Sequence, residues 1–227
     1  MEYQTVNALR EHLYIEKDLE KAKVNLALKP DFNIFDAFRI FDLNGNGYLT
    51  TSELRIGLQE IGVYASYDEV DLFFKRYDTN KNGRISFSEF ASALIPTDPY
   101  YAAMVNRRSS NSVYLRKYDP RDACFQFSTR QDFKDLMRSH MRSEQEGERL
   151  RQSVSNKPVF NTYDAFKSCD INDDGIVTGN EIRKLLESKG VYVNSQDVDQ
   201  IVGKFDKDRD GRISYSEFAE EFMPKSP

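Results

Sequence analysis

Apolar side chains recur three or four positions apart along most of this chain, a spacing that predicts amphipathic helices. Four short polar segments interrupt the pattern, and an apolar stripe precedes and follows each of them. Phe35, Phe38 and Phe41 lead into the first segment, for example, and Leu54 and Leu58 follow it. The pattern predicts four helix–loop–helix units in an all-α protein.

A further helix is predicted before these units, over about residues 5–28. Ile15, Leu19, Ala22 and Leu26 lie on one side of it, and charged residues lie on the other. This helix either fills an apolar groove of the same chain or docks on another protein, and the sequence leaves both possibilities open.

Another helix is predicted over about residues 128–154, between the second and third units. Its apolar face is formed by Phe133, Leu136, Met137, His140 and Met141. The face either packs against the rest of the chain or binds a partner. We favour packing, because apolar faces this wide seldom stay exposed.

The sequence repeats itself at an offset of 128 residues. Residues 33–96 align with residues 161–224 without a gap, and 26 of the 64 paired positions are identical. Within each copy the polar segment returns after 36 residues, which accounts for the four segments. The chain therefore contains two copies of one domain that itself holds two units.

The four polar segments share the form D-x-[DN]-x-[DN]-G-x₅-E. They are DLNGNGYLTTSE (42–53), DTNKNGRISFSE (78–89), DINDDGIVTGNE (170–181) and DKDRDGRISYSE (206–217). This is the pattern of an EF-hand calcium loop, and the chain resembles the calmodulin, troponin C and centrin superfamily of four-EF-hand proteins. Four intact loops, each between amphipathic helices, are hard to explain as ordinary Asp- and Asn-rich surface turns.

The resemblance implies that up to four Ca²⁺ ions bind, with Mg²⁺ as a possible competitor. Ca²⁺ takes oxygen ligands from loop positions 1, 3, 5, 7 and 12, where position 7 gives its backbone carbonyl, and from position 9 through a water. Glycine occupies position 6 of each loop, where a positive φ is needed. The implied ligands are Asp42, Asn44, Asn46, Tyr48 and Glu53; Asp78, Asn80, Asn82, Arg84 and Glu89; Asp170, Asn172, Asp174, Ile176 and Glu181; and Asp206, Asp208, Asp210, Arg212 and Glu217.

The loops differ in the number of carboxylates at these positions: two in the first and second, three in the third and four in the fourth. More ligand charge generally favours Ca²⁺, so we expect the C-terminal pair of loops to bind more tightly. Position 8 is apolar in every loop (Leu49, Ile85, Val177 and Ile213), which the resemblance assigns to a short two-stranded pairing between loops. Cys169 stands directly before position 1 of the third loop, where the family usually has Phe. We expect looser packing around it.

The fold class is therefore all-α, with two lobes of four helices and one short loop pairing each. We expect a helical extension over residues 1–30, a first lobe over 31–96, a basic and partly helical linker over 97–158, and a second lobe over 159–227.

Charge and composition narrow the class of protein further. The net charge is −5, but residues 97–158 hold twelve Lys and Arg against eight Asp and Glu, a balance of +4. That segment could attract the acidic lobes or an acidic partner; it carries no nucleic-acid-binding motif, so no nucleic acid is expected. No apolar run is long enough to span a membrane, and the charged N-terminus lacks the apolar block of a secretory signal, so we expect a cytoplasmic or nuclear location.

The two cysteines, Cys124 and Cys169, have no metal-type spacing, and reduced thiols are expected rather than a disulfide. For Cys124 we favour a buried and inert thiol. The histidines His12 and His140 each stand alone in the sequence, and ordinary solvated or packed side chains are the favoured interpretation.

Two functions remain open. The first is a calcium sensor or adaptor that grips amphipathic helices of a dedicated protein partner, because only Met223 of the five methionines falls in a lobe and promiscuous surfaces rely on Met. The alternative is a constitutive structural subunit of a cytoskeletal or axonemal assembly, since the chain also resembles four-EF-hand proteins of protist cilia. A calcium buffer would leave the extra helices unused. We do not expect an enzyme, because phosphate-loop, nucleophile-elbow and HExxH motifs are missing.

Overall fold

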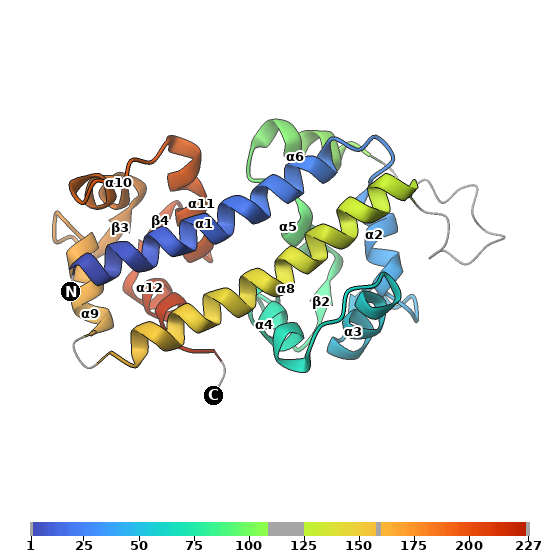
Figure 1. The fold of residues 1–227 in the computed structure, drawn as a ribbon, viewed down its shortest axis with the longest axis horizontal. Helices are drawn as coiled ribbons and strands as arrows, with labels where there is room; N and C mark the ends of the chain where they lie inside the picture. The colour runs from blue at the N-terminus through green and yellow to red at the C-terminus, as the bar shows by residue number, and fades with distance from the viewer. Residues whose placement is uncertain (1, 109–124, 158–159, 226–227) are drawn as a thin grey trace. The chain divides into compact units, whose positions relative to one another are not determined.

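The computed structural model describes residues 2–108, 125–157 and 160–225 (Figure 1). It is built from helices and two small antiparallel sheets, in agreement with the all-α class predicted above. The elements are α1 (Glu2–Ala27), α2 (Ile34–Phe41), β1 (Tyr48–Leu49), α3 (Thr51–Glu60), α4 (Tyr67–Tyr77), β2 (Ile85–Ser86), α5 (Phe87–Leu94), α6 (Pro99–Asn106), α8 (Phe127–Ser155), α9 (Thr162–Cys169), β3 (Ile176–Thr178), α10 (Gly179–Ser188), α11 (Ser195–Phe205), β4 (Arg212–Ser214) and α12 (Tyr215–Phe222).

The chain forms two compact units. One consists of residues 19–144 and is called the N-lobe unit below; the other consists of residues 1–18 and 145–227 and is called the C-lobe unit. Both α1 and α8 are therefore divided, so that each unit holds one EF-hand pair together with a part of each long helix. The segment boundaries expected from the sequence follow the repeat instead, with each long helix kept whole.

In the N-lobe unit, β1 pairs with β2 through Leu49 and Ile85, as the apolar residues at loop position 8 predicted. The rings of Phe38, Phe41, Phe73 and Phe90 lie in one core with side chains from outside the hands. Those additions are Phe133, Leu136, Met137 and Met141 of α8, Leu19 and Leu26 of α1, and Val105 of α6. The two long helices are thus part of the core of this unit.

The C-lobe unit is built in the same way. Strands β3 and β4 pair through Val177 and Ile213, which again confirms the prediction from position 8. Its core adds Val6, Leu9 and Leu13 of α1 and Val154 of α8 to the side chains of the hands. Cys169 is fully buried in this core with its thiol free, and burial raises its pKa to about 12. Cys124 lies outside the described residues.

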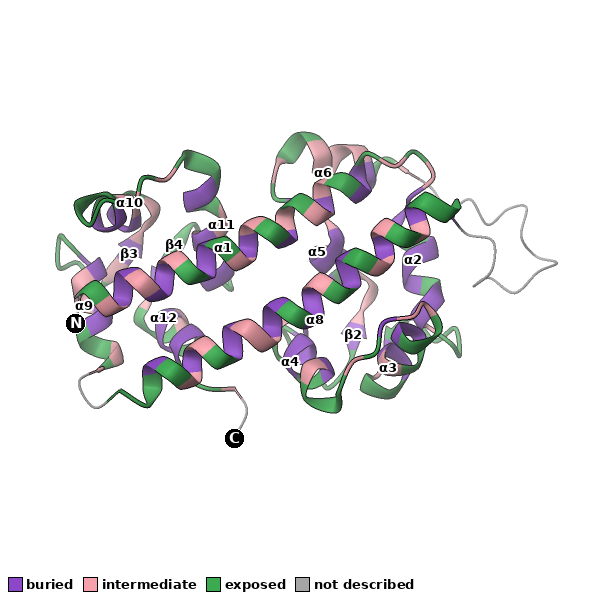
Figure 2. Cartoon of the chain, in the orientation of Figure 1, coloured by how far each residue is buried: buried purple, intermediate pink, exposed green. Residues whose placement is uncertain are grey.

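The packing predicted for the apolar face of residues 128–154 is confirmed, because all five of its side chains are buried. Figure 2 shows buried positions repeating along α1 and α8 between exposed ones. In α1 the stripe predicted from the sequence agrees with the packing at three positions: Leu19 and Leu26 are buried, and Ala22 is half-buried against the same core. Ile15 is half-buried as well. The buried stripe continues toward the N-terminus through Val6, Leu9 and Leu13.

Leu136→Ala tests whether α8 belongs to the core. Leu136 is fully buried, so its truncation is expected to cost about 2–5 kcal/mol of the free energy of unfolding, measured by urea denaturation followed by circular dichroism. Phe127→Ala is the matched control on the same helix, since Phe127 is 85% exposed and its loss is expected to change stability by less than about 0.5 kcal/mol. Equal effects of the two substitutions would contradict this packing.

Candidate functional site

Each candidate calcium loop begins where a helix ends. The C-cap residues of α2, α4, α9 and α11 are Asp42, Asp78, Asp170 and Asp206, which are the first residues of the four loops. Each of these carboxylates accepts hydrogen bonds from the backbone N–H groups of loop positions 5 and 6, at 2.7–3.2 Å. The first aspartate therefore folds its own loop back over itself.

Glycine at loop position 6 permits this sharp turn. Gly47 and Gly175 have φ values of +82° and +84°, which side chains with a Cβ rarely adopt. Beyond the turn, Tyr48, Ile176 and Arg212 lie in paired strands, which fixes loop position 7 in three of the loops. In the second loop, Arg84 directly precedes strand β2.

The side-chain oxygens at loop positions 3 and 5 each accept a hydrogen bond from the backbone N–H two residues further along the chain. In the first loop, the side-chain oxygen of Asn44 accepts from the N–H of Asn46 at 3.0 Å, and that of Asn46 accepts from the N–H of Tyr48 at 2.9 Å. The same two bonds recur in the other three loops. The loop thus gathers the oxygens that the sequence predicted to act together.

The glutamate at position 12 closes each loop from the following helix. One oxygen of Glu53 accepts from the backbone N–H and the hydroxyl of Thr50, and the other accepts from the side-chain amide of Asn44 at 2.6 Å. Glu89, Glu181 and Glu217 bridge their loops similarly, with the second oxygen on the N–H of loop position 2. These glutamates belong to capping boxes that start the exiting helices, so one side chain joins loop and helix.

Hydrogen bonding also keeps two of these glutamates ionised. Burial alone would raise the pKa of Glu217, but hydrogen bonds from Ser214 and from the N–H groups of Lys207 and Asp208 outweigh it and the pKa lies below its usual value. Burial would likewise raise the pKa of Glu89, and hydrogen bonds from Ser86 and Thr79 lower it overall. Both loops therefore hold a negative charge at position 12.

The fourth loop shows most directly why a cation fits. Carboxylate oxygens of Asp206, Asp208 and Asp210 lie within 4.8 Å of one another. The N–H of Asp210 lowers the pKa of Asp208, but desolvation and the charges of Asp210 and Glu217 outweigh it and raise the pKa overall. A divalent cation would relieve this repulsion, and a set made only of oxygen donors suits a hard ion such as Ca²⁺.

The sequence reasoning missed how the long helices are fastened to the lobes. In the C-lobe unit, Nζ of Lys204 lies 2.6 Å from a carboxylate oxygen of Glu16. In the N-lobe unit, a guanidinium nitrogen of Arg76 lies 2.5 Å from a carboxylate oxygen of Glu144. All four side chains are largely buried, so these ion pairs fix α1 and α8 within their units.

A hydrogen bond from a backbone N–H to a glutamate of a long helix also occurs at corresponding positions in the two units. Glu20 of α1 accepts a hydrogen bond from the N–H of Thr97 at 2.6 Å, and Glu148 of α8 accepts one from the N–H of Lys225 at 3.0 Å. The sequence did indicate that the two long helices are equivalent, although it did not indicate what they contact. The 128-residue offset, extended upstream, relates His12 to His140, Glu16 to Glu144 and Glu20 to Glu148.

The two histidines occupy corresponding places but differ in their hydrogen bonds. His140 lies 3.2 Å from the hydroxyl of Tyr77 through Nδ1 and 2.9 Å from the carbonyl of Ala93 through Nε2. His12 lies edge-on to Phe205 and Phe222, and neither of its ring nitrogens has a hydrogen-bond partner among the described residues. Of the two ordinary roles that the sequence left open, solvated or packed, both histidines have the packed one, because both are buried.

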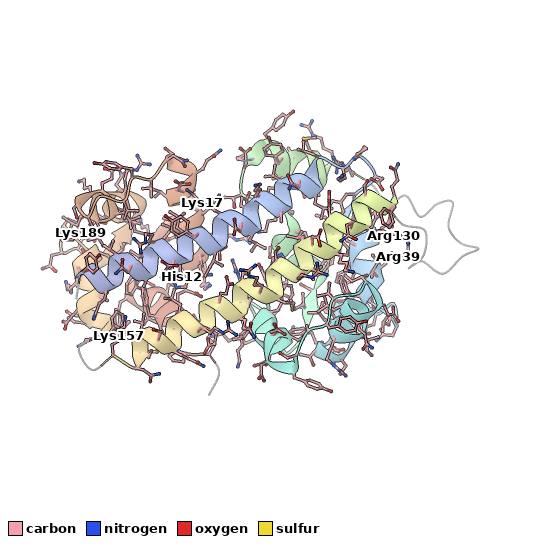
Figure 3. The ribbon with its side chains drawn as sticks, viewed as in Figure 1. His12, Lys17, Arg39, Arg130, Lys157 and Lys189 are labelled. Carbon is pink, nitrogen blue, oxygen red and sulfur yellow. The ribbon has the colours of Figure 1, made fainter. Side chains whose placement is uncertain are left out.

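Figure 3 labels His12 and Lys17, which both lie on α1. The ammonium group of Lys17 forms an ion pair with Asp197 of α11 at 2.9 Å. This contact adds to the buried pair between Glu16 and Lys204, so two neighbouring residues of α1 bind the same helix of the C-lobe unit.

A buried charge cluster ties α8 to α12 in the C-lobe unit. Arg151 bonds to Glu148 at 2.8 Å and lies 3.7 Å from Glu221, which also pairs with Lys207 and Lys225. Burial would raise the pKa of Glu221, but the charges of Lys207, Lys225 and Lys204 hold it well below its usual value. Lys207 is position 2 of the fourth loop, so this cluster connects the loop to the helix that follows it.

Comparison with known proteins agrees with this geometry. The family model described as "EF-hand domain pair" matches residues 31–95 and 160–223. The chain is 28% identical over 184 residues to "Probable calcium-binding protein CML11" of Oryza sativa subsp. japonica, covering 81% of this chain and 63% of that protein. It is 21% identical over 211 residues to "Centrin-3" of Homo sapiens, covering 93% of each. It is 29% identical over 98 residues to "Troponin C, isoform 1" of Drosophila melanogaster, covering 43% of this chain and 58% of that protein.

Two further findings concern length and membranes. The match to the first of these relatives spans 63% of its length, so this chain corresponds to only part of that protein. Among the described residues, no helix combines the length and the apolar character that a membrane crossing requires.

His12→Phe tests the consequence of burying an imidazole. Burial, with Lys204 next in effect and Arg151 adding to it, lowers the pKa of His12 to about 3 despite the opposing charges of Glu221 and Glu16. Because the folded pKa lies below the unfolded value of about 6.5, the neutral ring contributes stability above pH 6.5, which is lost as the pH falls toward 3. When the pH is lowered from about 7 to about 5, the free energy of unfolding of the wild-type chain should fall by about 2 kcal/mol more than that of the variant, as measured by urea denaturation.

His140→Phe is the comparison variant, because it removes hydrogen bonds that His12 does not make. It should lower stability by about 1–3 kcal/mol already at about pH 7, since Tyr77 and Ala93 lose their partner. If the free energy of unfolding changed with pH in the same way for the wild-type chain and for His12→Phe, His12 would not be buried in its neutral form.

The carboxylate counts predict unequal calcium sites in the intact chain. Glu217→Gln is expected to abolish one site of the tighter class, whereas Glu53→Gln should abolish one of the weaker class, because their loops hold four and two ligand carboxylates. Calorimetric titration with Ca²⁺ measures both classes. Assignment of the tighter class to the loop of Glu53 would refute the charge argument.

Proposed function

Because this chain belongs to the EF-hand domain pair family, within the calmodulin, troponin C and centrin superfamily, and binds calcium, we propose that it is a calcium-responsive adaptor for a dedicated protein partner. The ligands in this proposal are the residues at positions 1, 3, 5, 7 and 12 of the four loops. Calcium supplies positive charge that offsets the carboxylate repulsion within each loop.

One observation chiefly supports the adaptor role: each lobe holds helix segments that are not part of its own hands. Residues 2–18 of α1 pack into the C-lobe unit and residues 127–144 of α8 pack into the N-lobe unit, and we call them the resident segments. Phe133 of α8 contacts Phe41 at 6.0 Å between ring centroids, and His12 of α1 contacts Phe205 at the same distance. Each lobe is thus already shaped to hold an amphipathic helix, which is the mode of recognition we propose for the partner.

The chemistry favours a non-catalytic role. The carboxylates of the loops are committed to hydrogen bonds that close the loops, and acidic groups arranged in this way hold a cation rather than transfer protons. The words "calcium-binding protein" in the name of one relative agree with the cation-holding role proposed for the loops.

The alternative is a constitutive subunit of a cytoskeletal or axonemal assembly, within the cytoplasm. Burial of the resident segments is consistent with this alternative too, because lobes whose apolar interiors are filled can act as rigid parts. The similarity to Centrin-3 over 93% of both chains also supports it. In this case the partner would contact outer surfaces of the lobes, and calcium would stabilise the fold without exposing apolar surface.

Calcium-dependent exposure of apolar surface separates the two functions. For the adaptor, fluorescence of an apolar dye and hydrogen exchange of the resident segments should rise when Ca²⁺ replaces chelator, because opening of the hands loosens these helices. The Glu89→Gln/Glu217→Gln double variant is the control and should respond less. Unchanged dye binding and exchange, with calorimetry still reporting calcium uptake, would favour the structural subunit. Capture from native extract in calcium and in chelator would then reveal whether the partner's grip is conditional.

A further inference from the structure

The ion pairs that hold the resident segments occupy corresponding positions in the two units. Lys204 and Arg76 are related by the 128-residue offset, and so are Glu16 and Glu144. The basic residue lies on the helix that enters the second hand of its lobe, two positions before the first residue of the loop, and the acidic residue lies on the resident segment. The two halves of the chain therefore hold the same charged contact.

Burial makes this contact selective for an acidic side chain on the resident segment. The side chains of Lys204 and Glu16 are 3% and 9% exposed, and those of Arg76 and Glu144 are 14% and 4% exposed. A neutral side chain in place of Glu16 would leave the Lys204 ammonium buried without this carboxylate, and a basic side chain would add repulsion in a poorly solvated place. An acidic side chain at this point is therefore strongly favoured.

The residue one helical turn earlier has a defined environment as well. His12, four positions before Glu16, lies edge-on to Phe205 at 6.0 Å, and His140, four positions before Glu144, lies edge-on to Tyr77 at 5.5 Å. A flat, uncharged ring fits such a place, and the lowered pKa of His12 agrees with an uncharged imidazole there. Ring and carboxylate together define which helix each lobe accepts.

We propose that Arg76 and Lys204 are the specificity-determining residues of the two lobes: a partner helix that replaces a resident segment is amphipathic and carries an acidic side chain one turn after an uncharged ring. This rests on the adaptor function proposed above and names the chemistry of its partner. Charge complementarity selects this occupant over a basic amphipathic helix, which would bring a like charge to Lys204 or Arg76. Because Lys204 lies two residues before Asp206, the selecting residue and the first candidate ligand of the loop share one helix end.

A competition experiment in the intact chain tests the proposal. The host is the Leu13→Ala/Glu16→Gln variant, whose resident segment is weakened by loss of a buried side chain and of the ion pair. The probes are fluorescein-labelled peptides of residues 3–18, with Glu16 retained or changed to Gln or Lys. Fluorescence anisotropy in calcium should give the tightest binding for the Glu peptide, with the Gln peptide at least about tenfold weaker and the Lys peptide weaker still.

Charge reversal in the host identifies the residue responsible. Adding Lys204→Glu should reverse the order, so that the Lys peptide binds best, whereas adding Lys184→Glu, an equal charge change on the exposed side of α10, should leave the order unchanged. Equal binding of the three peptides, an unchanged order in the Lys204→Glu host, or no binding of any peptide would overturn the proposal. Formation of dimers that exchange segments regardless of residue 16, seen by light scattering, would also overturn it.

Calorimetry with Ca²⁺ on the same hosts separates this inference from the proposed function. Normal calcium uptake without discrimination among peptides would refute only the role of Lys204. Absence of calcium uptake at every loop would refute the calcium-responsive function itself.

Discussion

The constraint on which the rest of this structure depends is that an EF-hand pair does not cover its own apolar interior. In each unit, rings from the hands form a core to which α1 and α8 add buried side chains, as the contact between Phe41 and Phe133 illustrates. Leaving such surface in water would cost roughly 25 cal/mol for every Å² exposed. A lobe and its resident segment are therefore stabilised together, and any function of the lobe must include the fate of that helix.

The loops and their strands could be predicted from the sequence because they are local. Asp42, Gly47 and Glu53 act within one loop, and their hydrogen bonds depend on spacing alone. The helices were equally accessible from their apolar period, including the one over residues 127–155. For such features the chemistry of a residue and its neighbours fixes the geometry.

The assignment of the long helices to lobes could not be predicted in the same way, since it depends on contacts between residues far apart in the chain. Lys204 and Glu16 are separated by 188 positions, and nothing near either residue indicates the other. Ile15 was placed on the buried side but is only half-buried, because a helical period determines a stripe only to within about one position, whereas the core determines which residues it accepts. The upstream identity between His12 and His140 indicated that the two long helices are equivalent, but not which side chains of the lobes they contact.

Burial of the resident segments also limits how the lobes respond to calcium. If calcium favours a conformation in which the hands open, the free energy that holds the resident segment closed opposes calcium binding by the same amount, since the two equilibria are linked. A partner helix can offer Lys204 or Arg76 a carboxylate in place of the resident glutamate. Such a helix would remove part of this opposition, so partner and calcium would strengthen each other's binding. A helix that leaves the buried cation without its carboxylate gains no such advantage, however apolar its face. In the proposed adaptor, the ion pair would therefore make the calcium response of each lobe depend on the identity of the helix that it holds.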